Sequence, residues 1–267
     1  IGDEPYQMKT KFPQVTIAVD KDRCHGIEQL TDNSIAKDID VILLDDAFQH
    51  RAVKPTVSVV LVDFNRPTFK DHLLPMGRLR DLPERIGAAD IVIVTKCPSY
   101  IDEYEKAEWA KELGINGYDP VSCCGERKNG KKQHIFFSCI KYDSAQAIFE
   151  EGDPRYVYAQ RLILFTGIAN DKPLRDYLSG TYKIVRHFNY PDHHKFSRSD
   201  ISSISDAARL YPTSVIMTTE KDSQRIKDCT NSSDELKKKM FQAPIKAEFV
   251  SEGDHETFFT LLKSYLK

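Results

Sequence analysis

The stretch from Val41 to Arg51 constrains the fold of this chain more strongly than any other part of its sequence. It begins with four apolar residues, Val41 to Leu44, and two carboxylates, Asp45 and Asp46, follow at once. A short apolar run of this kind predicts a parallel strand that is buried on both faces. The carboxyl ends of such strands are where α/β proteins bind their ligands. The alternative is an acidic pair that only ends a strand and begins a turn.

Asp45 and Asp46 are candidate ligands for Mg²⁺. P-loop phosphotransferases hold this ion with an aspartate at the end of a strand, because a hard divalent cation prefers oxygen ligands fixed beside the phosphates. Three polar residues that can contact phosphate or water follow within one helical turn, namely Gln49, His50 and Arg51. The whole stretch therefore indicates phosphoryl transfer.

Arginines close to other predicted strands support the same chemistry. Further apolar runs predict strands of one sheet at residues 15–19, 57–64 and 91–95. Arg23 lies near the start of a predicted helix, and Arg78 and Arg80 lie in a loop that contains proline and glycine. The planar fork of an arginine can bind a phosphate dianion through two hydrogen bonds. Solvated surface cations are the alternative interpretation of all three arginines.

A second series of predicted strands and helices begins at Arg161 and carries a dense motif, Asp192, His193 and His194. This triplet has three interpretations: a metal ligand set, a histidine acid–base group poised by a carboxylate, or a surface loop. No other cluster of cysteine and histidine in the sequence supports a metal site, so we favour acid–base chemistry. The pattern predicts two domains, residues 1–143 and 144–267.

The bulk composition argues against several classes of protein. A formal net charge of -2 gives no basic field for binding nucleic acid. The six cysteines show no CxxC spacing and no signal peptide precedes them, which indicates a reducing cytoplasm. No apolar run approaches the roughly eighteen residues that span a bilayer. The chain begins with Ile1 and opens directly on a polar motif, from which we expect a truncated N-terminus.

Six motifs occur in a fixed order along the chain. They are GDEP at 2–5, DDAFQHR at 45–51, LLPMGRLRD at 73–81, GIAN at 167–170, DHH at 192–194 and TEKD at 219–222. In this order and at these separations, the chain resembles the tetraacyldisaccharide 4'-kinase (lipid A 4'-kinase) family of lipopolysaccharide synthesis over essentially its whole length. The resemblance implies transfer of the ATP γ-phosphate to the 4'-hydroxyl of a tetraacyldisaccharide 1-phosphate. It also implies ATP and Mg²⁺ as cofactors, and a peripheral location at the cytoplasmic face of the bacterial inner membrane.

By the same resemblance, Asp3 would be the base that takes the proton from the sugar hydroxyl. The DHH motif would supply its partner, which we assign to His193 with His194 as the alternative. An aspartate and a histidine can share a proton, which keeps the carboxylate ionised. Because Pro5 follows the acidic pair of GDEP, we expect an extended or turn conformation there.

The remaining candidates would act on the metal and the phosphates. The residues implied to contact Mg²⁺ are Glu4, Asp45 and Asp46. Those implied to contact phosphate or to orient the nucleophile are Gln49 and His50. Those implied to neutralise phosphate charge, which a largely electrostatic transition state requires, are Arg23, Arg78 and Arg80.

Two departures from the family pattern qualify these expectations. Ala47 stands where a glycine is common, and no G-x-x-x-x-G-K-[ST] phosphate loop occurs in the 267 residues. In the family, that loop and a membrane-associated helix precede GDEP. The expected fold is therefore α/β: a P-loop NTPase-like parallel sheet domain that lacks its first strand and P-loop, and a second, smaller α/β domain. We expect an inefficient kinase from the chain as written and an active one from the full-length protein.

Two other functions remain as alternatives. One is another P-loop phosphotransferase such as a GTPase, which would need an Asn-Lys-x-Asp motif that residues 95–98 do not provide. The other is a non-catalytic remnant that binds lipid or a partner.

Overall fold

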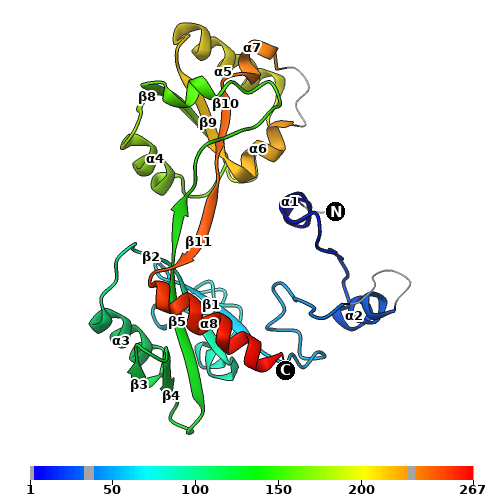
Figure 1. Ribbon diagram of the computed structural model, residues 1–267, viewed down its shortest axis with the longest axis vertical. Coiled ribbons are helices and arrows are strands. Elements are labelled where there is room, and N and C mark those ends of the chain that lie inside the picture. The colour runs from blue at the N-terminus through cyan, green and yellow to red at the C-terminus, as the bar shows by residue number, and fades with distance from the viewer. Residues whose placement is uncertain (1–2, 33–38, 228–231, 267) are drawn as a thin grey trace. The chain divides into compact units, whose positions relative to one another are not determined.

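The computed structural model describes residues 3–32, 39–227 and 232–266, with only the backbone for Asp3 (Figure 1). It divides into two compact units. Unit 1 consists of Ile1–Ile140 together with Ala247–Lys267, and unit 2 consists of Lys141–Lys246. This division differs from the one expected from the sequence, 1–143 and 144–267, because the end of the chain returns to unit 1.

Unit 1 is built on a mixed six-stranded sheet. Its strands in spatial order are β1 (Val59–Asp63), β2 (Ile91–Cys97), β5 (Lys132–Tyr142), β4 (Cys124–Glu126) and β3 (Asn116–Asp119), and β11 (Ile245–Phe249) also pairs with β5. β1, β2 and β5 run parallel, whereas β4 and β3 continue the sheet in antiparallel pairs. The α-helices described in this unit are α1 (Asp3–Lys11), α2 (Arg23–Thr31), α3 (Glu103–Glu112) and α8 (Glu252–Tyr265), and 3-10 turns lie at η1 (Thr68–Lys70) and η2 (Pro83–Ala88).

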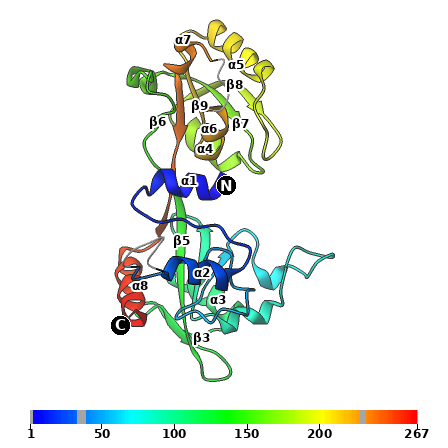
Figure 2. The ribbon, with the colours of Figure 1, turned by 90° about the vertical axis from the view of Figure 1, so that its right-hand side faces the viewer.

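Alternation along β5 gives the sheet of unit 1 a core on each face, because successive side chains of a strand point to opposite sides. Ile135 and Phe137 belong to a buried cluster with Ala110 of α3. Phe136, which lies between them in sequence, instead packs with Phe258 of α8. Figure 2 shows α3 and α8 on opposite sides of this sheet. The C-terminal helix therefore completes the core of unit 1.

Unit 2 is a second α/β unit with a five-stranded sheet. The strand order is β6 (Gln146–Ala147), β10 (Met240–Ala243), β9 (Val215–Thr219), β7 (Arg161–Thr166) and β8 (Lys183–Asn189). All neighbouring pairs are parallel except β6 and β10. The helices described here are α4 (Lys172–Ser179), α5 (Arg198–Leu210), α6 (Glu220–Lys227) and α7 (Asp234–Lys237), and a 3-10 turn lies at η3 (Pro154–Tyr158).

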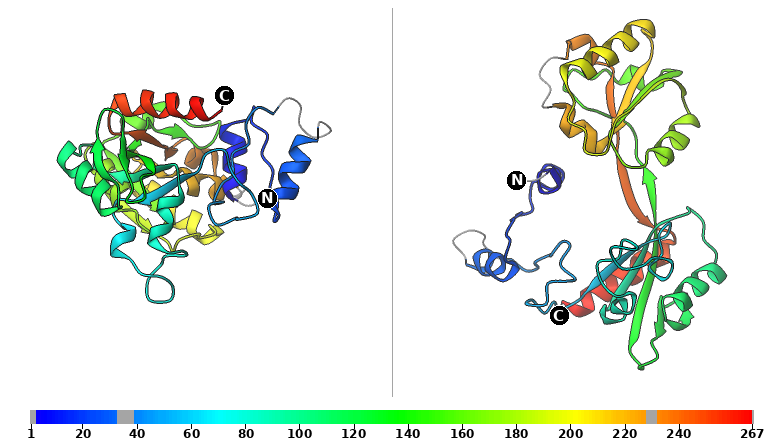
Figure 3. Two further views of the ribbon diagram at one scale, coloured as in Figure 1. Left: turned by 90° about the horizontal axis from the view of Figure 1, so that it is seen from below. Right: turned by 180° about the vertical axis from the view of Figure 1, so that it is seen from behind.

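The central strand β7 of unit 2 is buried on both faces. Ile163 and Phe165 pack in one cluster with Ile204 of α5, whereas Leu162 and Leu164 pack in another that includes α4. Helices accordingly cover both faces of the sheet, as Figure 3 shows. Among the described residues of the whole chain, no helix is both long and apolar enough to cross a membrane.

The sequence predicted most of these strands but was wrong about two of them. Strands expected at 57–64 and 91–95 are confirmed as β1 and β2. The runs at 15–19 and 41–44 form no strand, and several of their side chains are open to solvent, with Val19 67% and Leu43 90% exposed. An apolar run forms a β-strand only when its backbone hydrogen-bonds to a neighbouring strand. Neither run has such a partner among the described residues. Leu61 on β1, at the end of the sheet, is likewise 65% exposed.

A buried ion pair fastens α8 to unit 1. Lys106 of α3 lies 3.4 Å from the carboxylate of Asp254, and both side chains are under a tenth exposed. The second oxygen of Asp254 lies 3.4 Å from the Cys123 thiol. Asp254 and burial together raise the pKa of Cys123 to about 12, with burial the larger cause, so this thiol stays protonated. A buried charge without its partner strongly destabilises the folded state.

We therefore predict that Asp254→Ala strongly destabilises the protein. The substitution leaves the Lys106 ammonium buried and unpaired, which should lower the free energy of unfolding by about 3–5 kcal/mol. Glu256→Ala is the matched control, since Glu256 is an exposed acid on the same helix. Chemical denaturation measures both. A loss below about 1 kcal/mol for Asp254→Ala, or equal losses for the two variants, would contradict this account.

Candidate functional site

Polar side chains follow β1 and β2 at adjacent strand ends in unit 1. Asp63 ends β1, and its carboxylate lies 2.6 Å from the ammonium of Lys96 on β2. Lys96 has a φ of 58°, which lies in the left-handed region and re-aims its side chain at the end of the strand. Parallel pairing places both residues at one edge of the sheet, which is the edge where α/β proteins bind ligands.

Several of the residues predicted to contact metal or phosphate gather around Asp46. Arg80 binds this carboxylate through both guanidinium arms, at 2.6 and 3.1 Å. The hydrogen bonds from Arg80 lower the pKa of Asp46, and the charges of His50 and Arg23 add to the effect. Asp46 is therefore ionised at neutral pH and has three predicted phosphate-contacting residues around it. The pair is exposed, so it contributes little to stability.

The other predicted residues of unit 1 lie at its surface. The side chains of Asp45, Gln49 and Arg78 are exposed, and the structure places no described partner on Asp45. Glu4 is exposed on α1. The side chain of Asp3, the predicted base, falls outside the described residues. Among the residues described, no three His, Cys, Asp or Glu side chains form a group that could hold a metal ion.

The expected conformation of the GDEP motif is wrong. Asp3 and Glu4 were expected in a turn, but α1 begins at Asp3 and includes Pro5. A proline is compatible with the first turn of a helix, because the N–H that it lacks would have no partner there. The helix ends with lysines in its last turn, where they complement the helix dipole.

A denser cluster lies beyond the strand ends of unit 2. Its centre is Asp222, a carboxylate with no exposed surface at the start of α6. Asp222 accepts hydrogen bonds from the backbone N–H of Gly167 at 2.9 Å, from the Thr219 hydroxyl at 2.8 Å and from the Arg225 guanidinium at 3.1 Å. Gly167 follows the end of β7, Thr219 ends β9 and Arg225 lies on α6. The hydrogen bonds to Asp222 therefore connect the GIAN motif to the TEKD motif.

Gly167 permits this close approach. A Cβ at this position would lie 3.1 Å from a carboxylate oxygen of Asp222 and 3.3 Å from the Cβ of His194. Both distances are tighter than ordinary contacts, so the backbone of the GIAN turn can pack against TEKD and DHH only because a side chain is absent.

The two histidines of DHH lie in different environments. The His193 side chain is 64% exposed, its backbone has a φ of 61°, and its ring Nδ1 lies 3.0 Å from Arg225. The His194 side chain is 26% exposed, lies 3.0 Å from Asp200 and stacks on the Tyr190 ring at 4.5 Å. His194 is thus held in an aromatic cluster, whereas His193 faces solvent with polar partners. The sequence alone could not separate them.

Arg225 and Asp222 are functional candidates that the sequence analysis did not single out. TEKD was one of the six motifs, but no role was given to Asp222, and Arg225 lies beyond the motif. The signal in the sequence is a charged cluster directly after the apolar run VIMTT, which forms β9.

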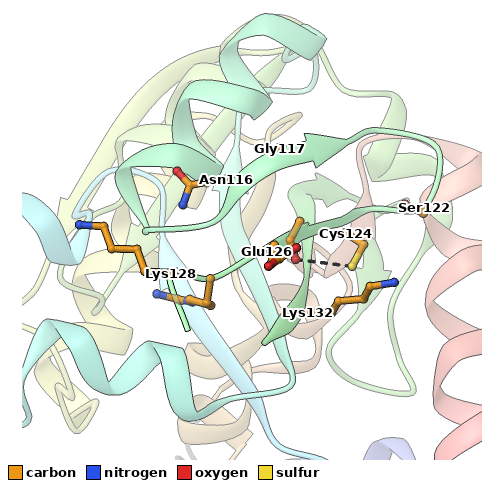
Figure 4. A pocket seen from close by; sticks show the side chains of 9 residues that line it. Asn116, Gly117, Ser122, Cys124, Glu126, Lys128 and Lys132 are labelled. Atoms are coloured by element: carbon orange, nitrogen blue, oxygen red, sulfur yellow. Dashed lines mark hydrogen bonds between the residues drawn. The ribbon is translucent and has the colours of Figure 1, made fainter. Parts of the chain in front are cut away.

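Two surface pockets are not lined by the residues that cluster around Asp46 and Asp222. A pocket of about 590 Å³ lies over the β3–β4–β5 part of unit 1, lined by residues such as Asn116, Glu126, Lys128 and Lys132 (Figure 4). A smaller one of about 350 Å³ is formed by residues 71–76 with Pro83. The second belongs to the loop that carries Arg78 and Arg80, whereas the first contains none of the predicted residues.

A family model described as Tetraacyldisaccharide-1-P 4'-kinase matches residues 1–267. The chain is 36% identical to the Tetraacyldisaccharide 4'-kinase of Phocaeicola vulgatus over 273 residues, which cover 100% of this chain and 70% of the relative. It is 38% identical to that of Bacteroides thetaiotaomicron over 264 residues, which cover 94% of this chain and 65% of the relative.

The fold also matches a solved structure. The crystal structure of LpxK from Aquifex aeolicus, described as in complex with ATP, aligns with a TM-score of 0.61 and 20% identity. The alignment covers 100% of this chain and 69% of that chain. At this identity the likeness supports the fold alone.

Proposed function

Because the chain belongs to the tetraacyldisaccharide-1-P 4'-kinase family, we propose that it takes part in ATP-dependent phosphorylation of the 4'-hydroxyl of a tetraacyldisaccharide 1-phosphate in lipid A synthesis. The observation that carries the proposal is the family match over the entire chain, together with the ordered motifs at residues 2–5, 45–51, 73–81, 167–170, 192–194 and 219–222. The motifs at 45–51 and 73–81 supply the cluster around Asp46 in unit 1, and those at 167–170, 192–194 and 219–222 supply the cluster around Asp222 in unit 2.

The cluster around Asp46 is suited to phosphate and metal chemistry. Mg²⁺ uses one or two carboxylates and completes its shell with water and phosphate oxygens, so the adjacent Asp45 and Asp46 would offer fitting donors. Among the described residues, Glu4 forms no three-carboxylate group with them. The ion, when bound, would neutralise charge that develops on the transferred phosphoryl group. Arg23, Arg80 and His50 around Asp46 provide further positive or donor groups for the same purpose. We assign Gln49 and Arg78, which are exposed nearby in sequence, to contacts with phosphate.

We assign the base to Asp3 and its histidine partner to His193 rather than His194. His194 is occupied by Asp200 and stacked on Tyr190, whereas His193 is the more exposed of the two. A group that exchanges a proton with substrate or base must be reachable, and only His193 meets this condition.

We also propose that the loop of residues 71–82 contacts the acyl chains of the lipid at the cytoplasmic face of the inner membrane. Leu74 is 62% and Met76 85% exposed in this loop, and Arg78 follows directly. The loop is held by its own hydrogen bonds, including those from the backbone N–H groups of His72 and Arg78 to Asp71. Exposed apolar side chains beside a cation suit the boundary between acyl chains and phosphates.

These residues do not include every part that a kinase of this type needs. No G-x-x-x-x-G-K-[ST] sequence, whose backbone cradles nucleotide phosphates, occurs in the 267 residues. We infer that these residues alone transfer phosphate inefficiently. The chain spans about two thirds of the length of its curated relatives, so the activity has to be tested in a protein that also carries such a loop.

The first test measures ATP- and Mg²⁺-dependent phosphorylation of tetraacyldisaccharide 1-phosphate. The protein is this chain joined at its N-terminus to an upstream segment that carries a G-x-x-x-x-G-K-[ST] phosphate loop. We expect activity in the joined protein, little in the 267 residues alone, and a loss of about 10²–10⁴-fold in Asp3→Ala, because that variant lacks the base. Asp206→Ala, an exposed acid on α5, is the control. A folded but inactive joined protein, or a fully active Asp3→Ala, would refute the proposal.

A second test addresses the lipid-contacting loop. Leu74→Asp and Met76→Asp place a charge where acyl chains are proposed to lie, so binding to vesicles containing anionic phospholipid should fall several-fold in a sedimentation assay. Val121→Asp is the matched control, because Val121 is an equally open apolar residue of unit 1, 83% exposed, outside the loop. Equal losses in all three variants, or none in the loop variants, would argue against this surface.

A further inference from the structure

Three segments of unit 2 meet at one point. There, a series of polar contacts leads from a buried carboxylate to an exposed imidazole. The segments are the turn after β7, the loop between β8 and α5, and the first turns of α6. They contribute Gly167, His193 and the pair Asp222 and Arg225. The contacts run in one direction, from the interior to the surface.

The buried end of this series of contacts, the pair of Asp222 and Arg225, is rigid because both charges are buried and paired. Asp222 has no exposed surface, and the Arg225 side chain that binds it is only 10% exposed. Removing either charge from water is costly unless the partner and further hydrogen bonds compensate. Here Gly167 and Thr219 supply the further donors to the carboxylate, which leaves Arg225 one preferred position.

The contact between Arg225 and His193, at the surface end of this series of polar contacts, determines which nitrogen of His193 carries the proton. Nη2 of Arg225 lies 3.0 Å from Nδ1 of His193. A guanidinium stays charged and can only donate, so Nδ1 must present its lone pair. The proton of the neutral imidazole is then on Nε2.

Lys221 is the competitor for this histidine. Its ammonium lies 3.3 Å from Nε2 of His193 and, like the guanidinium, can only donate. A neutral imidazole has one lone-pair nitrogen, so it can accept from Arg225 or from Lys221 but not from both. Arg225 is nearer and is fixed by Asp222, whereas Lys221 is a third exposed and lies 3.9 Å from the carboxylate of Asp192.

The backbone of His193 is held by the same contacts. Its N–H donates to the carbonyl of Gly167 at 3.2 Å, and that carbonyl also accepts from Arg225 at 3.3 Å. The left-handed φ of 61° at His193 is sustained by these bonds. Ring and backbone are therefore oriented together.

We propose that Asp222 and Arg225 are positioning residues that hold His193 in its Nε2–H tautomer. In this form the exposed ring offers Nε2–H as a hydrogen-bond donor, beside Asp192 at 3.7 Å and Lys221 at 3.3 Å. It can therefore bind and orient an ionised carboxylate rather than act as the base itself. The catalytic meaning of this arrangement rests on the proposed kinase function, in which Asp3 is that carboxylate. The tautomer itself does not depend on that function.

The test is long-range ¹H–¹⁵N correlation NMR of the histidine rings in this chain at a pH where imidazole is neutral. His193→Asn identifies the resonances. We expect the wild type to show only the Nε2–H form. In Arg225→Met, Lys221 is the cation that remains beside the ring among the described residues, so the population should shift toward the Nδ1–H form. Adding Lys221→Met to that variant should reverse the shift, and Lys221→Met alone should change nothing.

Two further variants keep the result interpretable. Arg225→Lys retains a positive charge for Asp222 but lacks the second arm that reaches Nδ1, so it should fold and still show the shift. Arg209→Met, which removes an exposed arginine on α5, should show none. In the joined protein, Arg225→Lys should lower kcat about tenfold and leave KM for ATP unchanged. An Nδ1–H form in the wild type, or no shift in either Arg225 variant, overturns the proposal. An inactive wild type with the expected shifts would refute only the kinase function.

Discussion

The buried carboxylate of Asp222 is the contact on which the arrangement of unit 2 at its strand ends depends. Three donors converge on it, Gly167 from a segment far away in sequence and Thr219 and Arg225 from within three residues, at a position with no exposed surface. An unpaired ion there would be strongly unfavourable, so the network forms as a whole. The position of GIAN, of DHH and of the first turns of α6 follows from this one group.

The charged cluster of unit 1 is of a different kind. Asp46 and Arg80 are both more than half exposed, so water and salt screen their attraction, and the pair adds little to the stability of the fold. Such a pair can exchange partners at small cost when a phosphate or a cation arrives. The buried network of unit 2 is therefore suited to fixing a side chain, and the exposed cluster of unit 1 to accepting a charged ligand.

Much of the fold could be predicted from the sequence because buried parallel strands appear as continuous apolar runs. RLILF in β7 and IVIVT in β2 show this directly, and both are buried in the structure. The runs at 15–19 and 41–44 have a similar apolar pattern but pair with no strand among the described residues. An apolar pattern favours burial, but it does not determine whether a neighbouring strand is present. The return of α8 to unit 1 was hidden for a similar reason, as it depends on contacts between Lys106 and Asp254, which are distant in sequence.

The motifs identified the residue types of the candidate site but not their contacts. Arg23, His50 and Arg80 all act on the pKa of Asp46, and their contact with phosphate stays a prediction, whereas the role proposed for Arg225 could not be found from sequence. A single arginine in a helix carries no signal of its own, and its partner His193 lies in another segment. The difference between His193 and His194 likewise arises from tertiary packing against Tyr190 and Asp200.

Comparison of His193→Asn with His194→Asn in the joined protein tests the central claim most directly, through the rate of ATP-dependent phosphorylation of tetraacyldisaccharide 1-phosphate. Both substitutions remove Nε2, but only His193 is placed to exchange or share a proton with the reacting groups. The account predicts a loss of about 10²-fold or more for His193→Asn, and near-normal turnover with reduced stability for His194→Asn. Full activity in His193→Asn, or a selective loss of turnover in a stable His194→Asn, would contradict it.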